Sequence, residues 1–151
     1  MDDNTDDVGQ SIGRYAVQAL IATGWALGSV YRCRDTKLMR DVAVFLVADT
    51  LDEELASQIR REFQMLAGLS HLHLVKIYDV GVWNSREYAV LEFIDAGSLN
   101  QYIRTDVHLP WSTALRIGAT VSGALTYVHS EGILWGNVTP ANVLLRSTGD
   151  P

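Results

Sequence analysis

The polar residues best suited to chemistry are gathered in residues 132–145, which read Gly-Ile-Leu-Trp-Gly-Asn-Val-Thr-Pro-Ala-Asn-Val-Leu-Leu. This stretch holds Asn137, Thr139 and Asn142 but no charged side chain. An amide cannot act as a general base, a role that typically contributes ~10²–10⁴-fold to catalysis. A lone amide is also a poor magnesium ligand, because Mg²⁺ prefers carboxylates together with phosphates. We therefore expect Asn142 to bond the local backbone and no metal to bind here.

Other reactive side chains show no catalytic or metal-binding spacing. The four histidines have no ligand pattern with carboxylates or cysteine, and no Ser–His–Asp arrangement is suggested. Cys33 is the single cysteine, so no intramolecular disulfide can form. We expect Cys33 to be a small packed hydrophobe.

Composition indicates a folded protein with one good core, because 48% of the 151 residues are hydrophobic and 20% are charged. The net charge of −6 argues against a nucleic-acid partner. Four aspartates lie in the first seven residues, so residues 1–12 are expected to be a disordered acidic tail. The longest apolar run, Val42–Ala48, is too short to span a bilayer, and no signal peptide is visible, which predicts no membrane insertion and a cytoplasmic location.

Short β-branched and aromatic runs predict strands over residues 15–21, 29–34, 42–48, 74–82 and 87–93. Between the third and fourth of these, Thr50 and Glu53 are typical of a capping box that opens a helix reaching about Leu69. A short helix is expected from Gly97-Ser98 to about Arg104, and a longer one from Pro110 to a stop at Gly132. Strands, one helix, strands and then helices make an α+β order, with a boundary near residues 94–97.

Several of these segments resemble stretches of eukaryotic-like Ser/Thr protein kinases of bacteria. They are Gly28-Ser29-Val30-Tyr31, Asp41-Val42-Ala43-Val44, Arg61-Glu62, His71-Leu72-His73-Leu74-Val75, Tyr88-Ala89-Val90-Leu91-Glu92 and the frame of residues 132–145. The resemblance implies a kinase-like N-lobe over residues 13–93, with an antiparallel five-stranded sheet and the αC helix. It implies a hinge and a partial helical C-lobe over residues 94–151, truncated before the magnesium-binding loop.

The residues that the family uses for phosphoryl transfer are replaced here. By the resemblance, Phe45 stands at the position of the strand lysine, Asn137 at the catalytic Asp and Thr139 at its neighbouring Lys. Catalysis in kinases is positioning plus electrostatics, so losing these charges removes what the reaction needs. The chain is therefore expected not to be an enzyme but a pseudokinase.

The resemblance also implies a remnant of a nucleotide pocket. Apolar residues match those around adenine, and the hinge backbone could still offer hydrogen bonds; the residues concerned are Val30, Ala43, Leu91, Glu92, Ile94 and Leu144. Any core would contain such residues as well. No cofactor is expected, and ATP or ADP would bind weakly at most.

Three functions stay open. The first is a protein-binding or regulatory module that binds a kinase or its regulator, or that self-associates through the long helix. Candidate contact residues are Trp25, Arg60, Arg61, Phe63, Gln64, Trp111 and Leu115. The second is a nucleotide-binding switch or weak kinase that retains adenine binding. The third is a truncated kinase remnant without a function.

Overall fold

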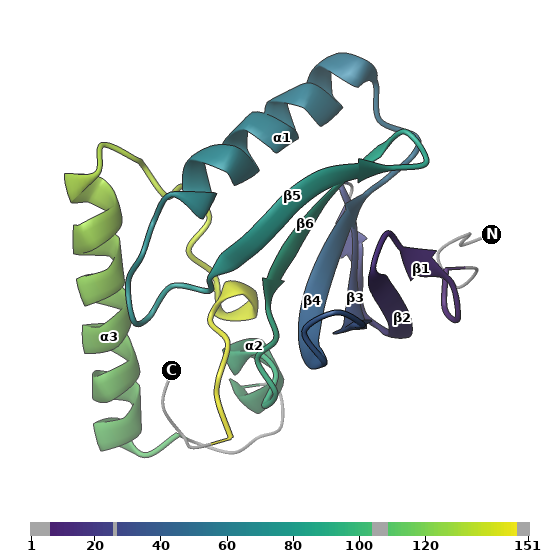
Figure 1. The fold of residues 1–151 in the computed structure, drawn as a ribbon. Coiled ribbons are helices and arrows are strands. Elements are labelled where there is room, and N and C mark those ends of the chain that lie inside the picture. The colour runs from purple at the N-terminus through teal and green to yellow at the C-terminus, as the bar shows by residue number, and fades with distance from the viewer. Residues whose placement is uncertain (1–6, 26, 104–108, 148–151) are drawn as a thin grey trace. The chain divides into compact units, whose positions relative to one another are not determined.

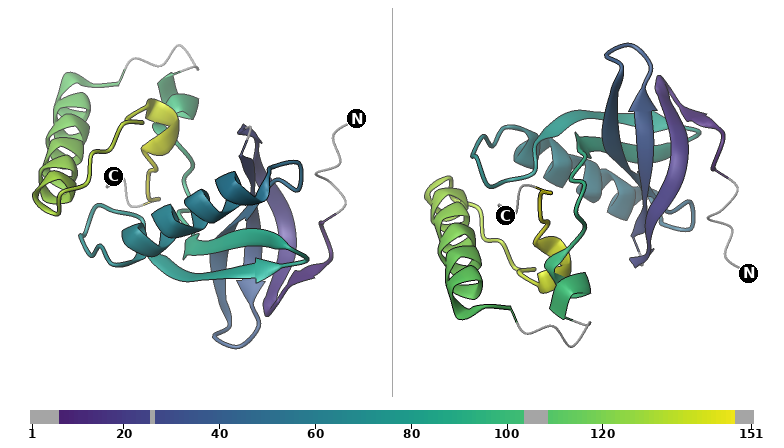
Figure 2. Two further views of the ribbon diagram at one scale, coloured as in Figure 1. Left: turned by 90° about the horizontal axis from the view of Figure 1, so that it is seen from above. Right: turned by 90° about the horizontal axis from the view of Figure 1, so that it is seen from below.

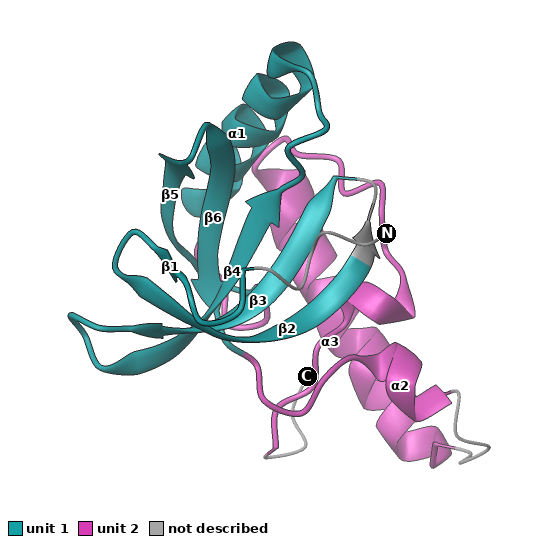
Figure 3. Ribbon diagram, turned by 90° about the vertical axis from the view of Figure 1, so that its right-hand side faces the viewer, with its two compact units in different colours: residues 1–69, 75–93 teal, residues 70–74, 94–151 magenta. Residues whose placement is uncertain are grey.

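The computed structural model describes residues 7–25, 27–103 and 109–147. The chain divides into two compact units (Figure 3). Unit 1 comprises residues 1–69 and 75–93, and unit 2 comprises residues 70–74 and 94–151. Each unit has its own set of elements, which Figure 1 labels along the chain.

Unit 1 is built on one antiparallel sheet of six strands in the order β1-β2-β3-β4-β6-β5. The strands are β1 (Ser11–Ile12), β2 (Tyr15–Trp25), β3 (Gly28–Asp35), β4 (Arg40–Val47), β5 (Ile77–Trp83) and β6 (Arg86–Glu92). The α+β class and the antiparallel N-lobe sheet are confirmed. The sheet has one strand more than expected, because β1 pairs with the start of β2.

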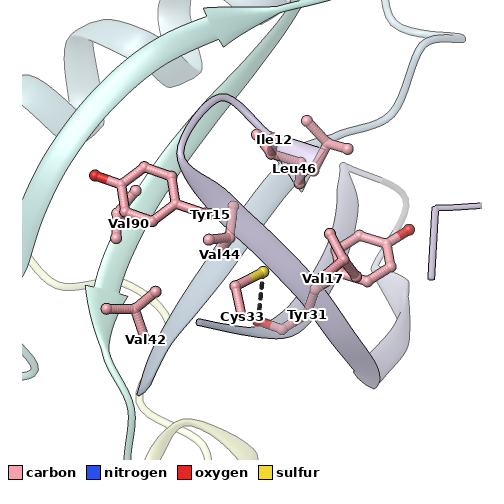
Figure 4. Packing of buried hydrophobic residues seen from close by; sticks show 9 residues of the cluster. All are labelled: Ile12, Tyr15, Val17, Tyr31, Cys33, Val42, Val44, Leu46 and Val90. Atoms are coloured by element: carbon pink, nitrogen blue, oxygen red, sulfur yellow. Dashed lines mark hydrogen bonds between the residues drawn. The ribbon is translucent and has the colours of Figure 1, made fainter. Parts of the chain in front are cut away.

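One face of this sheet carries the larger core of unit 1. Along β3 the side chains alternate, so that Tyr31 and Cys33 are fully buried while Arg32 between them is exposed. Figure 4 shows these two residues packed with neighbours from β1, β2, β4 and β6, namely Ile12, Tyr15, Val17, Val42, Val44, Leu46 and Val90. Cys33 is thus buried as expected, and burial raises the pKa of its thiol to about 12.

The opposite face of the sheet is covered by helix α1 (Glu53–Ala67), which lies over β5 and β6 (Figures 1 and 2). Its N-cap is Asp52, whose carboxylate accepts a hydrogen bond from the Leu55 N–H at 2.8 Å. The prediction that Thr50 caps this helix is therefore wrong. A carboxylate at this position also interacts favourably with the positive end of the helix dipole, which a threonine hydroxyl does not.

Unit 2 contains α2 (Leu99–Ile103), α3 (Trp111–Ser130) and the short 3-10 helix η2 (Pro140–Asn142). The chain leaves α3 through Gly132, whose φ of 78° favours glycine, as expected for the end of this helix. Residues 70–74 join this unit through α3: the Ser70 N–H bonds the Tyr127 hydroxyl at 3.2 Å, and the His71 ring stacks on Tyr127 at 5.2 Å. No helix in the described part of the chain is both long and apolar enough to cross a membrane.

Part of the expected acidic tail differs from expectation, because residues 7–12 take part in the fold. Ser11–Ile12 form β1, and Ile12 is fully buried. Asp7 is also buried, although it belongs to the run of aspartates that predicts a solvated tail.

Strands β3 and β4 are joined by an ion cluster, which makes a testable contribution to stability. Arg32 and Arg34 of β3 both donate hydrogen bonds to Asp41 of β4 and hold the pKa of that carboxyl below its usual range. Such a carboxyl stabilises the fold above its unfolded pKa of about 3.9, and this stability is lost as pH falls through the folded pKa. Asp41→Asn should therefore lower the free energy of unfolding at pH 7, and the difference from the wild type should shrink below about pH 4.

Urea unfolding followed between pH 7 and pH 2.5 measures this difference. Asp49→Asn is the matched control, because Asp49 is exposed and forms no ion pair with a described residue. A gap between Asp41→Asn and the wild type that stays constant over the whole pH range would contradict the assignment.

Candidate functional site

The candidate site is the face of the sheet that looks toward α1. Val30 of β3 is the direct partner of Phe45 of β4, and Ala43 of β4 is the direct partner of Leu91 of β6. Direct partners in a sheet project to the same side. The structure thus brings four of the residues singled out from the sequence to one face.

Gly28, the first residue of β3, lies on this face at a position where a side chain has no room. A Cβ atom at this position would fall on the carbonyl oxygen of Leu46 and would lie 3.0 Å from Cζ of Phe45. The Phe45 ring therefore reaches the glycine backbone. An apolar ring occupies the space beside the glycine, and it offers no charge to a phosphate group.

Phe45 also forms the contact that joins the sheet to α1. It is 6% exposed, and its ring meets that of Phe63 edge to face, with centroids 5.4 Å apart at 61°. Val47 and Ile59 are buried in the same cluster. Aromatic pairs of this geometry contribute ~0.5–1.5 kcal/mol beyond the area that they bury.

Two charged residues of α1, Arg60 and Glu62, make contacts of different kinds. Glu62, which lies in the segment Arg61-Glu62 that resembles the family, is exposed and accepts a hydrogen bond from Gln58 of its own helix at 3.4 Å. The ion pair that joins helix to sheet is instead Arg60–Glu87, at 3.1 Å, with the Glu87 side chain only 10% exposed.

The residues expected around a nucleotide fall in both units. Val30, Ala43 and Leu91 are half-buried in unit 1 and leave an apolar surface beside Phe45. The Glu92 N–H of the expected hinge donates to the Lys76 carbonyl at 2.8 Å, so it is already engaged. The two others, Ile94 and Leu144, are half-buried in unit 2.

The stretch that follows α3 is shaped by local hydrogen bonds. The Asn142 side-chain amide donates to the Asn137 carbonyl at 3.0 Å, and the Asn142 N–H donates to the Thr139 carbonyl at 2.9 Å. Asn142 thus makes the local backbone contact expected of it. Within the described residues, no group of three His, Cys, Asp or Glu side chains comes together as a metal site.

The expected partner-binding residues differ in what they present to solvent. On α1, Phe63 lies against Phe45 and Arg60 pairs with Glu87, whereas Arg61 and Gln64 are exposed. On α3, Trp111 is 79% exposed and Leu115, one turn later, is 65% exposed. The side chain of Trp25 lies outside the described residues.

Two contacts of the site could not be found from the sequence. The Phe45–Phe63 pair depends on how α1 is rotated over the sheet, and the Arg60–Glu87 pair joins residues 27 positions apart. For the second pair the sequence offered one signal, which is Glu87 itself. A glutamate that is buried inside an apolar strand needs a partner.

Comparisons with known proteins agree on one family. The model described as "Protein kinase domain" matches residues 15–151. The chain is 33% identical over 141 residues to the serine/threonine-protein kinase PknB of Mycobacterium leprae, covering 89% of this chain and 22% of that protein. It is 36% identical over 126 residues to PknK of Mycobacterium tuberculosis, covering 82% of this chain and 11% of that protein. The chain therefore spans a quarter or less of each of these relatives.

A solved structure with the same fold is the PknI kinase domain of Mycobacterium tuberculosis. The TM-score is 0.78 at 28% sequence identity, and the match covers 93% of this chain and 58% of the PknI chain. The similarity thus extends through both units and confirms the resemblance found in the sequence.

The expectation that this chain is not an enzyme is contradicted by these comparisons. The relatives are named serine/threonine-protein kinases, which are enzymes. Phe45, Asn137 and Thr139 mark where this chain departs from the family pattern, and they do not by themselves show a loss of activity.

The contact between sheet and helix can be tested by a double-mutant cycle with Phe45→Leu and Phe63→Leu. Each change removes an aromatic ring but keeps an apolar side chain, so the two losses should be non-additive by about 0.5–1.5 kcal/mol. The free energy of unfolding of the four proteins, measured in urea, gives this coupling. Phe45→Leu combined with Phe93→Leu is the control, because Phe93 stacks on Arg32 and the two losses should add. Additive losses for Phe45 and Phe63 would show that the ring pair does not join α1 to the sheet.

Proposed function

Because this chain belongs to the protein kinase domain family, we propose that it is a regulatory module of serine/threonine kinase signalling that binds a kinase through the exposed side of α1. The observation that carries this proposal is the contact between Phe45 and Phe63. It attaches α1 to the sheet through apolar packing at the position where the resemblance places a charged lysine. The position of α1 is thus supported by an apolar contact that requires no bound ligand.

A helix that is attached in this way can present its outer side to a partner without first being ordered. Binding costs less free energy when the contact residues are already in place. Arg61 and Gln64 lie on the exposed side of α1, and Met65 beside them is 51% exposed. Arginine and methionine are enriched in protein–protein interfaces. Exposed Trp111 and Leu115 on α3 supply a further apolar surface, and self-association there is the alternative mode of binding.

The test is direct binding to the kinase domains of the source organism, measured by calorimetry, together with the rate at which each kinase phosphorylates a peptide. We expect one kinase to bind and its rate to change in a saturable way as the chain is added. Arg61→Glu should weaken the affinity about tenfold or more, which corresponds to ~1.4 kcal/mol. Lys37→Glu makes the same charge change at an exposed position of the β3–β4 turn and should leave the affinity unchanged. Equal affinities for the two variants would remove α1 from the interface, and no binding to any kinase domain would refute the proposal.

A second candidate function is weak binding of an adenine nucleotide. It is favoured by the half-buried apolar surface that Val30, Ala43 and Leu91 form on one face of the sheet. Phe45 lies beside Gly28, so the phosphate groups gain no favourable charge from this side. Binding would then rest on the base alone.

Thermal melts with adenosine, ADP and ATP plus magnesium test this candidate. A ligand at five times its Kd adds ~1 kcal/mol to the stability of the native state, which raises the Tm of a domain of this size by roughly 2–4 °C. We expect adenosine and ATP at equal concentration to give the same small shift, and Ala43→Asp to abolish it. A much larger shift with ATP and magnesium than with adenosine would contradict this account, because it would show that the phosphates are bound.

A further inference from the structure

A buried carboxylate on unit 1 has no role in the site described above. Asp7 is 8% exposed, although it lies near the start of the chain in a run of aspartates. Its Oδ2 atom accepts a hydrogen bond from the Tyr31 hydroxyl at 3.0 Å and lies 3.5 Å from Nη1 of Arg86. Asp7 belongs to the N-terminal segment (residues 7–10), Tyr31 to β3 and Arg86 to the start of β6.

The two groups that receive this carboxylate are themselves held in place. Tyr31 is fully buried in the larger core, and its hydroxyl points away from the other residues of that core (Figure 4). The Arg86 side chain is 16% exposed, and its Nε donates to the Val47 carbonyl at 2.8 Å. Burial, together with the hydrogen bond to Asp7, raises the pKa of Tyr31 to about 12, so its hydroxyl remains a donor at physiological pH.

The N-terminal segment delivers Asp7 to these groups through its backbone. The Gln10 N–H bonds the Asp7 carbonyl at 3.1 Å, which closes a turn. This turn is fastened to β2, because the Val17 N–H bonds the Gln10 carbonyl at 2.9 Å and the Gly9 N–H bonds the Val17 carbonyl at 3.2 Å. The carboxylate is therefore presented by a segment that is docked as a unit.

A buried phenol and a mostly buried guanidinium that face the same oxygen are a recognition site for an anion. A guanidinium removed from water needs an opposite charge, and a carboxylate with two donors satisfies this need. We propose that Tyr31 and Arg86 form a carboxylate-binding site on unit 1, which the N-terminal segment fills as an intramolecular ligand through Asp7.

Occupation of this site bears on the position of α1. Arg86 holds the Val47 carbonyl at the end of β4, five residues before the helix cap Asp52. The next residue, Glu87, pairs with Arg60 on α1 itself. A carboxylate that keeps Arg86 in place therefore supports both connections between the sheet and α1, so the N-terminal segment is coupled to the helix.

Rescue of an emptied site by a free carboxylate tests the proposal in the whole 151-residue chain. Asp7→Ala removes the carboxylate and should lower the Tm by roughly 3–10 °C, because a hydrogen-bonded charge is lost from a buried pair. Sodium acetate at ~0.2 M should then raise the Tm of Asp7→Ala by about 1–3 °C relative to sodium chloride at equal ionic strength, since acetate binds only the folded state. Amide hydrogen exchange in residues 48–55 should speed up in this variant and slow again with acetate.

Three control variants distinguish the binding of acetate at this site from a general effect of the salt on stability. Asp7→Asn fills the same space with an amide, so it should lose stability but gain nothing from acetate. Asp7→Ala with Tyr31→Phe lacks the phenol donor and should not be rescued. Asp79→Ala removes an exposed carboxylate that bonds the Tyr15 hydroxyl at 3.0 Å, and it should show a small loss and no rescue.

The pattern of outcomes decides the proposal. Rescue of Asp7→Ala alone, accompanied by restored exchange in residues 48–55, supports a carboxylate site coupled to α1. Equal effects of acetate on all variants, or an unchanged Tm for Asp7→Ala, would overturn the site. Rescue of the Tm without any change of exchange in residues 48–55 would overturn the coupling to α1.

Discussion

The apolar cluster between the sheet and α1 is the contact on which unit 1 depends. Phe45 lies at its centre, since it packs against Phe63 of the helix and fills the space beside Gly28. A glycine is required there because a Cβ would meet the Leu46 carbonyl oxygen. The same ring thus contacts both the helix and the backbone at Gly28. This is why one substitution, seen from the sequence as a lost charge, has a structural consequence as well.

Most of the fold could be predicted from the sequence, because the patterns that define it are local. Alternation marks β3, and the residues around Gly97 and Gly132 mark the helices of unit 2. The cap of α1 was predicted wrongly, since Thr50 and Asp52 both satisfy capping rules and the choice between them depends on how the chain leaves β4. Strand β1 was not predicted, because a strand of two residues is too short to show an alternation of apolar and polar side chains.

The site was less predictable than the fold. The positions of Phe45, Asn137 and Thr139 follow from the resemblance, but what surrounds them depends on contacts between distant segments. Nothing in the sequence links Phe45 to Phe63 or Asp7 to Tyr31, because each pair is brought together by the register of the sheet and the rotation of a helix. The run of aspartates at the start of the sequence predicted that Asp7 is solvated, because a high local density of charge favours exposure to water, whereas Asp7 is buried.

The interleaving of the two units has a consequence for how the chain folds. Residues 70–74 are part of unit 2, held by Tyr127 of α3, yet they lie between α1 and β5 of unit 1. The backbone therefore passes from unit 1 into unit 2 at residue 70 and returns to unit 1 at residue 75, before the last two strands of the sheet. Strands β5 and β6 follow these residues in the sequence. Bringing Tyr127 to Ser70 closes a loop of 57 residues, at an entropic cost that grows only slowly with loop length. A cut between residues 93 and 94 would leave the connection after α1 without its anchor, so the two units are expected to acquire their native structure together and to resist dissection into independent domains.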